Sequence, residues 1–234
     1  MRFHDHPSPN HDARPGIVDM LILHYTGMES AAAALDRLCS PEAKVSAHYL
    51  IEEDGAVWRL VAEERRAWHA GVSSWRGRCD INGASIGVEL VNPGHGLDYR
   101  PFPEPQMAAL EMLARDILAR HPIPPRHVLG HSDVAPQRKT DPGEFFDWQR
   151  LARAGVGLWP DFTVLPPPAA GIAELQRQLA AIGYDTPQSG AEDALTTAVI
   201  TAFQRHFRPS LCDGKADPET RRRIAALAAA LATS

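Results

Sequence analysis

The sequence predicts an α/β fold with a central mixed sheet flanked by helices, followed by a small C-terminal three-helix bundle. In the first 165 residues, apolar β-branched runs typical of buried strands alternate with helical patterns. Residues 166–168 are three consecutive prolines, which favour an extended, semi-rigid spacer and exclude helix. Every pattern after them is helical. We therefore predict a domain at 1–165, a linker at 166–171 and a second domain at 172–234.

Within the first domain, strands and helices are expected to alternate. In chain order, the predicted elements are a strand at 17–25, a helix at 32–38, a hairpin at 48–60, a strand at 85–91, a helix at 106–120, a strand at 127–130 and a helix at 147–154. The turn pair Asp54-Gly55 indicates the hairpin, and apolar residues spaced along one face indicate the helix at 106–120. Residues 1–15 are polar and proline-rich, so we expect a flexible lead-in there.

The second domain contains three helical patterns. The first covers 172–181 and is stopped by Gly183, and the second covers 194–206 with apolar residues spaced for one buried face. Asp217 opens the third, which runs to the C-terminus with Pro218 in its first turn. Three helices in about 60 residues are near the lower size limit for independent stability.

Bulk composition excludes several classes of partner. The net charge is −5 at pH 7, so the chain has no basic field to attract nucleic acid or an acidic membrane. No stretch approaches the roughly 20 apolar residues of a membrane span. The three cysteines form no CxxC pair, and residues 1–15 lack the apolar core of a signal peptide. We therefore expect a cytoplasmic monomer; a leader missing from this sequence would place it in the periplasm.

Two histidines and an aspartate are candidates for a metal site. His24 ends a predicted buried strand, His131 follows a short one, and Asp141 lies in a tight loop ten residues further on. Two His and one Asp are a usual catalytic zinc set, because three protein ligands leave a fourth position for water. The spacing of these residues in sequence does not by itself exclude the alternative, which is that they are structural histidines whose ring nitrogens are hydrogen-bonded within the protein.

Hydrolysis at such a site also requires a proton acceptor and a cation near the developing oxyanion. Glu89 lies inside the apolar run 85–91, where a carboxylate is costly unless it is paired or functional. Lys139 lies two residues before Asp141 on the same loop. The alternatives are a glutamate that faces water on an edge strand and a solvated loop lysine.

The other histidines have simpler explanations. Those without an acidic or apolar-strand context are expected at the surface: His95, His121 and His206. His48 and His69 are expected to support the site by packing and by hydrogen bonds that line its groove.

Five stretches, in order along the chain, resemble one family. They are LILHYTG, VSAHYLIEEDG, RAWHAGVSSWRG, NGASIGVELVN and GHSDVAPQRKTDPG, between Leu21 and Gly143. The family is the type-2 N-acetylmuramoyl-L-alanine amidases, AmpD- and AmiD-like zinc enzymes related to peptidoglycan-recognition proteins. The resemblance implies hydrolysis of the amide between N-acetylmuramic acid, or its 1,6-anhydro form, and L-alanine, for cell-wall turnover or recycling.

The resemblance also implies roles for individual residues. The residues that match the ligands of one Zn²⁺ ion per chain are His24, His131 and Asp141. Glu89 matches the catalytic carboxylate, and Lys139 the lysine that faces the tetrahedral intermediate. The residues expected to contact the peptidoglycan or muropeptide substrate are Lys44, His69 and Asn82.

At two positions the chain departs from some AmpD-like relatives. These relatives have arginines that hold a free carboxylate of the stem peptide, where this chain has Asp80 and Lys44. Lys44 offers a point charge without a bidentate fork, and Asp80 would repel a carboxylate. Arg76 and Arg78 lie close in sequence and could take over this role.

The second domain resembles the three-helix peptidoglycan-binding domain that often accompanies such amidases. The resemblance rests on ELQRQLAAIGY, TAVITAFQRHF and CDGKADPETRRRIAAL; the alternative is a helical dimerisation or packing appendage. For the whole chain, one alternative is a non-catalytic peptidoglycan receptor, which loss of a zinc ligand would mark. The other is a zinc peptidase that acts on the stem peptide.

Overall fold

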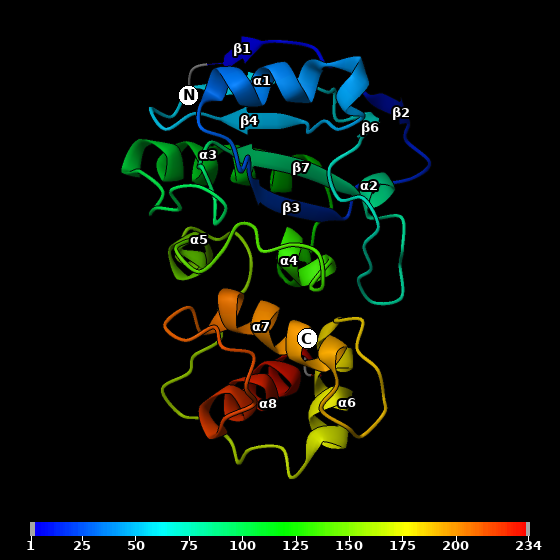
Figure 1. Cartoon of the computed structure of the whole chain (residues 1–234), viewed down its shortest axis with the longest axis vertical. Coiled ribbons are helices and arrows are strands. Elements are labelled where there is room, and N and C mark those ends of the chain that lie inside the picture. The colour runs from blue at the N-terminus through cyan, green and yellow to red at the C-terminus, as the bar shows by residue number, and fades with distance from the viewer. Residues whose placement is uncertain (1–2, 233–234) are drawn as a thin grey trace.

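A mostly parallel sheet of six strands forms the centre of the structure, a computed structural model that describes residues 3–232 (Figure 1). In spatial order its strands are β1 (Phe3–Asp5), β5 (Val57–Arg59), β4 (Tyr49–Ile51), β7 (Ser85–Leu90), β3 (Met20–Tyr25) and β8 (Val128–Gly130). Strands β4 and β5 pair antiparallel, as the hairpin pattern predicts, whereas β3 pairs parallel with both β7 and β8. The sheet is therefore mixed, and the predicted fold class is confirmed.

The two long strands, β3 and β7, have an apolar face and a face that carries polar side chains. On one face they pack against helix α3 (Glu104–Arg120), which lies behind the sheet in Figure 1; the residues of this face are Leu21, Leu23, Ile86, Val88 and Leu90. Because successive side chains point to opposite faces of a sheet, His24 and Glu89 lie on the other face. They are neighbours there, because β3 and β7 pair them in register.

The face that carries His24 and Glu89 is covered by short elements. Helix α1 (Ala31–Cys39) packs against Leu50 and Leu60, and the Ser30 side chain caps it by accepting a hydrogen bond from the Ala33 N–H. The other helices and 3-10 turns of this part of the chain are η1 (Pro41–Ala43), α2 (Ile81–Ala84), η2 (Pro125–His127), α4 (His131–Val134) and α5 (Trp148–Arg153).

The lead-in at the N-terminus is ordered from Phe3 onward, so the prediction of a flexible segment was wrong. Strand β1 pairs with β5, and the His4 ring stacks on Trp58 with centroids 4.7 Å apart. A second sheet joins β2 (His11–Ala13) to β6 (Arg65–Ala67). Both pairings involve partners about 50 residues away, which the local composition of the lead-in does not reveal.

The C-terminal part consists of α6 (Ile172–Ile182), α7 (Ala194–Phe207) and α8 (Pro218–Ala232). The third helix opens as predicted, with Pro218 in its first turn and Asp217 accepting a hydrogen bond from the Thr220 N–H at 2.8 Å; residues 233 and 234 of the predicted helix lie outside the described residues. One apolar cluster contains both Leu129 and Val134 from the first part and Leu179 and Phe203 from the bundle. The bundle therefore packs directly below α4 and α5 (Figure 1). No helix within residues 3–232 is long and apolar enough to cross a membrane.

Candidate metal centre

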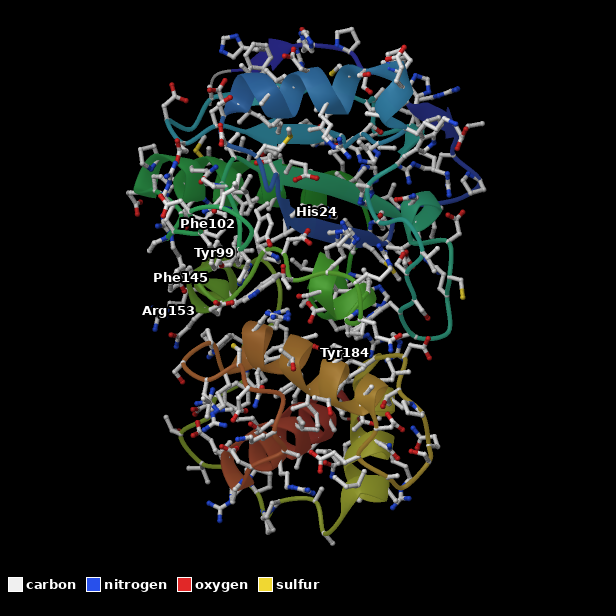
Figure 2. All side chains as sticks on the ribbon, in the orientation of Figure 1. His24, Tyr99, Phe102, Phe145, Arg153 and Tyr184 are labelled. Carbon is white, nitrogen blue, oxygen red and sulfur yellow. The ribbon has the colours of Figure 1, made fainter. Side chains whose placement is uncertain are left out.

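His24, His131 and Asp141 converge at one edge of the sheet. His24 lies near the carboxyl end of β3, and His131 begins α4 directly after β8, which is parallel to β3. All three side chains are buried, and their potential ligand atoms lie within 4.8 Å of one another. Within residues 3–232, no other group of three or more His, Cys, Asp or Glu residues has this arrangement. Figure 2 shows His24 at β3, above α4 in this view.

The three ligand atoms form a nearly equilateral triangle. His24 Nδ1 lies 3.0 Å from His131 Nδ1 and 2.9 Å from Asp141 Oδ2, and the third side measures 3.1 Å. A tetrahedral zinc ion with N and O ligands at about 2.0–2.2 Å holds its ligand atoms about 3.3 Å apart. The triangle therefore fits a zinc ion with only a small expansion, and a fourth position remains open.

The second nitrogen of each imidazole is fixed by a hydrogen bond. The Ser85 hydroxyl donates to the carbonyl of Ile81 at 2.7 Å, so it must accept from His69 Nε2 at 3.2 Å. His69 Nδ1 is then an acceptor, and His24 Nε2–H donates to it at 3.1 Å. This chain of donors leaves the lone pair of His24 Nδ1 free for a metal.

His131 is oriented in the same way by a backbone carbonyl. Its Nε2–H donates to the Ala70 carbonyl at 3.0 Å, which turns Nδ1 toward the other two ligand atoms. Arg138 donates to that same carbonyl and to the Val72 carbonyl, both at 3.0 Å. Arg138 thereby holds the loop that contains Ala70 in place next to His131.

The protonation states of His24 and Asp141 suit metal binding. Burial, and then the neighbouring His131, lower the pKa of His24 to about 4, so its imidazole is neutral near pH 7. Burial raises the pKa of Asp141, but the two histidines outweigh it and hold that pKa well below its usual range. Neutral imidazoles and an ionised carboxylate are the forms that bind zinc.

Gly87 makes room for the supporting histidine. It lies between Ser85 and Glu89 on β7, and a Cβ at this position would lie 2.5 Å from His69 Cγ. A larger residue would push His69 away from His24. The glycine in SIGVEL therefore has a packing reason that its sequence context does not show.

Glu89 presents a carboxylate oxygen without a partner. Its Oε2 is buried and accepts no hydrogen bond from any described residue. Burial raises the pKa of Glu89 well above its usual range, the charge of Asp141 raises it further, and Lys139 opposes both. A buried, unpaired carboxyl group with a raised pKa is typical of a group that transfers protons.

A cavity of about 350 Å³ opens above these groups. Its lining includes the three candidate ligands, Glu89, His69 and three cationic side chains; the cations are Arg37, Arg138 and Lys139. Sequence reasoning missed Arg37, because it lies on the otherwise largely apolar helix α1 and no motif marks it. The same applies to Arg138, which lies inside a family stretch but next to the more conspicuous Lys139.

A family model described as N-acetylmuramoyl-L-alanine amidase matches residues 13–144, more than half of the chain. The chain belongs to this amidase family. A second family model, which describes a peptidoglycan binding domain, matches residues 168–224.

Individual relatives of this amidase agree with the assignment. AmiD from Escherichia coli K12 is 41% identical over 230 residues, which cover 87% of this chain and 79% of AmiD. The structure of E. coli AmiD with anhydro-N-acetylmuramic acid-L-Ala-D-gamma-Glu-L-Lys matches with a TM-score of 0.81 at 39% identity, covering 92% of this chain and 91% of AmiD. AmpDh3 from Pseudomonas aeruginosa also matches with a TM-score of 0.81, at 36% identity over 94% of this chain and 92% of its own.

Two residues that the sequence suggested for substrate binding lie outside the cavity of the amidase. Lys44 is exposed at the end of η1, and Asn82 is buried in α2. The Asn82 side-chain oxygen accepts hydrogen bonds from the backbone N–H groups of His69 and Ala70, at 3.1 and 2.7 Å. Neither Lys44 nor Asn82 lines the cavity, whereas His69 does.

The suggested substitutes for the missing arginines also lie elsewhere in the amidase. Arg78 forms an ion pair with Asp19 at 2.6 Å, and Arg76 donates to the carbonyl of Ala181. Asp80 is paired with Arg66 at 2.9 Å. The expectation that Arg76 or Arg78 could replace the missing arginines was wrong, because tertiary contacts turn both side chains away from the cavity.

Proposed function

We propose that this amidase hydrolyses the amide bond between N-acetylmuramic acid, or its 1,6-anhydro form, and L-alanine in peptidoglycan fragments. One zinc ion per chain would be held by His24 Nδ1, His131 Nδ1 and Asp141 Oδ2. The observation that carries the proposal is the convergence of these three atoms beside the unpartnered Glu89 Oε2, at one cavity. The muropeptide bound to E. coli AmiD supports the choice of substrate.

The donor set fits zinc in number and chemical type. When bound, zinc lowers the pKa of a coordinated water to about 7 and polarises a carbonyl oxygen. His69 and Ala70 keep the two imidazoles in the tautomers that this binding requires.

Glu89 moves the proton in this reaction. Its Oε2 accepts the proton of the attacking water and then delivers it to the departing alanine nitrogen. Lys139 lines the same cavity, so its ammonium group can stabilise the oxyanion that develops on the lactyl carbonyl.

The cavity also favours an anionic peptide. The Arg37 side chain forms no ion pair or hydrogen bond within residues 3–232, and the Arg138 side chain donates only to backbone carbonyls. A γ-linked glutamate, as in the muropeptide bound to AmiD, leaves its α-carboxylate free. We propose that Arg37 binds a stem-peptide carboxylate, because a free guanidinium can form a bidentate pair with it.

Replacing Arg37 with alanine is expected to raise KM for such a muropeptide about 10-fold and to change kcat little, because a charge-assisted contact to a non-reacting group is lost. Steady-state kinetics would measure both constants. The control is Arg115→Ala, which removes an exposed arginine from α3, away from the cavity. An unchanged KM in Arg37→Ala would contradict this role. With a substrate whose carboxylate is amidated, the variant and the wild type should have the same KM.

Mass analysis of products tests the reaction itself. The zinc-loaded full-length chain is incubated with an anhydromuramyl tripeptide. An amidase releases anhydromuramic acid and a peptide that starts with free L-alanine. A product in which alanine remains on the sugar would establish a zinc peptidase instead, and binding without turnover would establish a receptor. Parallel assays on soluble muropeptide and intact sacculi would show which of the two this chain prefers.

The free thiols support a reducing compartment. Cys39, Cys79 and Cys212 are all unpaired, and Cys79 is exposed. Exposed unpaired thiols are typical of proteins in the cytoplasm. We keep the cytoplasm as the proposed location, which fractionation of the source cells would test.

A further inference from the structure

Asp133 connects the metal centre to the C-terminal bundle. It lies in α4, two residues after His131, and only 1% of it is exposed. Its carboxylate accepts three hydrogen bonds: from the Gly130 N–H at 2.8 Å, from the Tyr184 hydroxyl at 2.7 Å and from His206 Nδ1 at 2.8 Å. Two of these three donors belong to the bundle.

His206 is built into this contact. Sequence context placed it at the surface, and this expectation was wrong, because only 4% of it is exposed. The ring is stacked between Trp148 of α5, 3.7 Å away, and Phe207, 4.0 Å away. Asp133 is 73 residues from His206 in sequence, so no local pattern could have shown this partner.

Tyr184 reaches Asp133 because the bundle approaches the first part of the chain very closely. The Arg76 N–H donates to the Gly183 carbonyl at 2.8 Å, and a Cβ on Gly183 would lie 2.6 Å from the Trp75 ring. Gly183 also has φ of 144°, which other residues rarely adopt. Figure 2 shows Tyr184, the next residue, at the boundary between the bundle and α4.

The same turn of α7 also reaches the segment that carries Asp141. Arg205, next to His206, lies 3.9 Å from Glu144, three residues after Asp141. This ion pair is long and partly exposed, so it is weaker than the buried contact of Asp133. In addition, the Ser132 N–H donates to the Asp141 carbonyl at 2.9 Å, which ties α4 to this loop. Movement of α4 would therefore displace both ligand segments.

From these contacts we infer that the C-terminal bundle is a structural part of the metal centre. Tyr184 and His206 are positioning residues: they hold Asp133, and through it the short helix that presents His131. A buried carboxylate that loses its donors must rehydrate or shift, and α4 would move with it. The inference rests on the proposed zinc site, and it adds a role to the bundle that wall binding does not require.

The experiment measures zinc affinity of the full-length double variant Tyr184→Phe/His206→Phe. Both substitutions keep an aromatic ring in place and remove only the polar donors to Asp133. Competition with a chelator is expected to show about 10-fold weaker zinc binding, the lower end of the range for lost outer-shell partners. Tyr184→Phe alone, which removes a single hydroxyl, should shift the zinc Kd in the same direction by a smaller factor.

The matched control is Thr220→Val, which also removes a buried hydroxyl from the bundle. Thr220 Oγ1 accepts hydrogen bonds from Gln204 at 3.1 Å and Arg208 at 2.8 Å, and the other side-chain hydrogen bonds of these two partners go to the segment 213–219. This variant should melt at a lower temperature than wild type but bind zinc with unchanged affinity.

Two results would overturn the inference. The first is wild-type zinc affinity in the double variant. The second is an equal loss of affinity in the double variant and in Thr220→Val, because the effect would then reflect bundle stability alone. In either case the wild-type chain would still bind zinc and the proposed function would stand, whereas a wild-type chain without stoichiometric zinc would refute that function first.

Discussion

Glu89→Gln is expected to lower kcat/KM by about a hundredfold or more, because a general base and acid contributes roughly this factor. The substitution keeps the shape of the side chain but removes its capacity to accept the proton of the attacking water. Glu89 Oε2 accepts no hydrogen bond from the described residues, so no contact within the protein is lost with it. Burial first, and then the charge of Asp141, raise the pKa of Glu89, as is typical of a group that transfers protons.

Zinc content separates this effect from damage to the site. Glu89 is not one of the three clustered ligand residues, so the variant should retain one zinc ion per chain. Metal analysis and steady-state kinetics on the same preparation provide both values. Glu192→Gln, at an exposed position in the bundle, is the control and should match wild type in both. Turnover of Glu89→Gln near the wild-type rate would reject the assigned role.

His131→Ala should remove the metal and the activity together. Only His24 Nδ1 and Asp141 Oδ2 would remain of the triangle, and catalytic zinc sites in proteins normally have three protein ligands. The loss of activity should exceed the roughly 100-fold that loss of an outer-shell partner can cost. The variant also leaves the Ala70 carbonyl without one of its donors, which would loosen the neighbouring loop.

The measurement for His131→Ala is zinc per chain after dialysis, followed by the rate with added zinc. His121→Ala is the matched control, because His121 binds Glu63 at 2.7 Å and does not line the cavity. It should keep both zinc and activity. One tightly bound zinc ion per chain in His131→Ala would show that the ligand set has been assigned incorrectly.

The bundle has a larger structural role than its sequence suggests. Its helical patterns and the prolines at 166–168 describe a unit attached by a spacer. In the structure, residues from both sides of that spacer form one apolar cluster, and Asp133 takes two hydrogen-bond donors from the bundle. Side-chain periodicity shows which face of a helix is apolar. It does not show which other part of the chain that face packs against.

The failures of sequence reasoning have a common cause. The N-terminal strands, the buried His206 and the orientation of Arg76 all depend on partners far away in the chain. Arg37 had no motif to mark it, and only the cavity shows that it faces the same space as Lys139. The residues next to each of them in sequence give no sign of its role, because the residues that surround it in the folded protein lie elsewhere in the chain.

The α/β fold class, the longer strands and helices and the family could be predicted from the sequence, because apolar periodicity and the five family stretches are local properties of the chain. The candidate metal ligands could also be identified from the sequence. The folded structure was needed to show that the three candidate ligands meet within 4.8 Å, that Ser85 and His69 set the tautomer of His24, and that α7 supports α4. Parallel pairing of β3 with β8 brings His24 and His131 together across 107 residues. Such a contact arises from packing in three dimensions, and no local pattern encodes it.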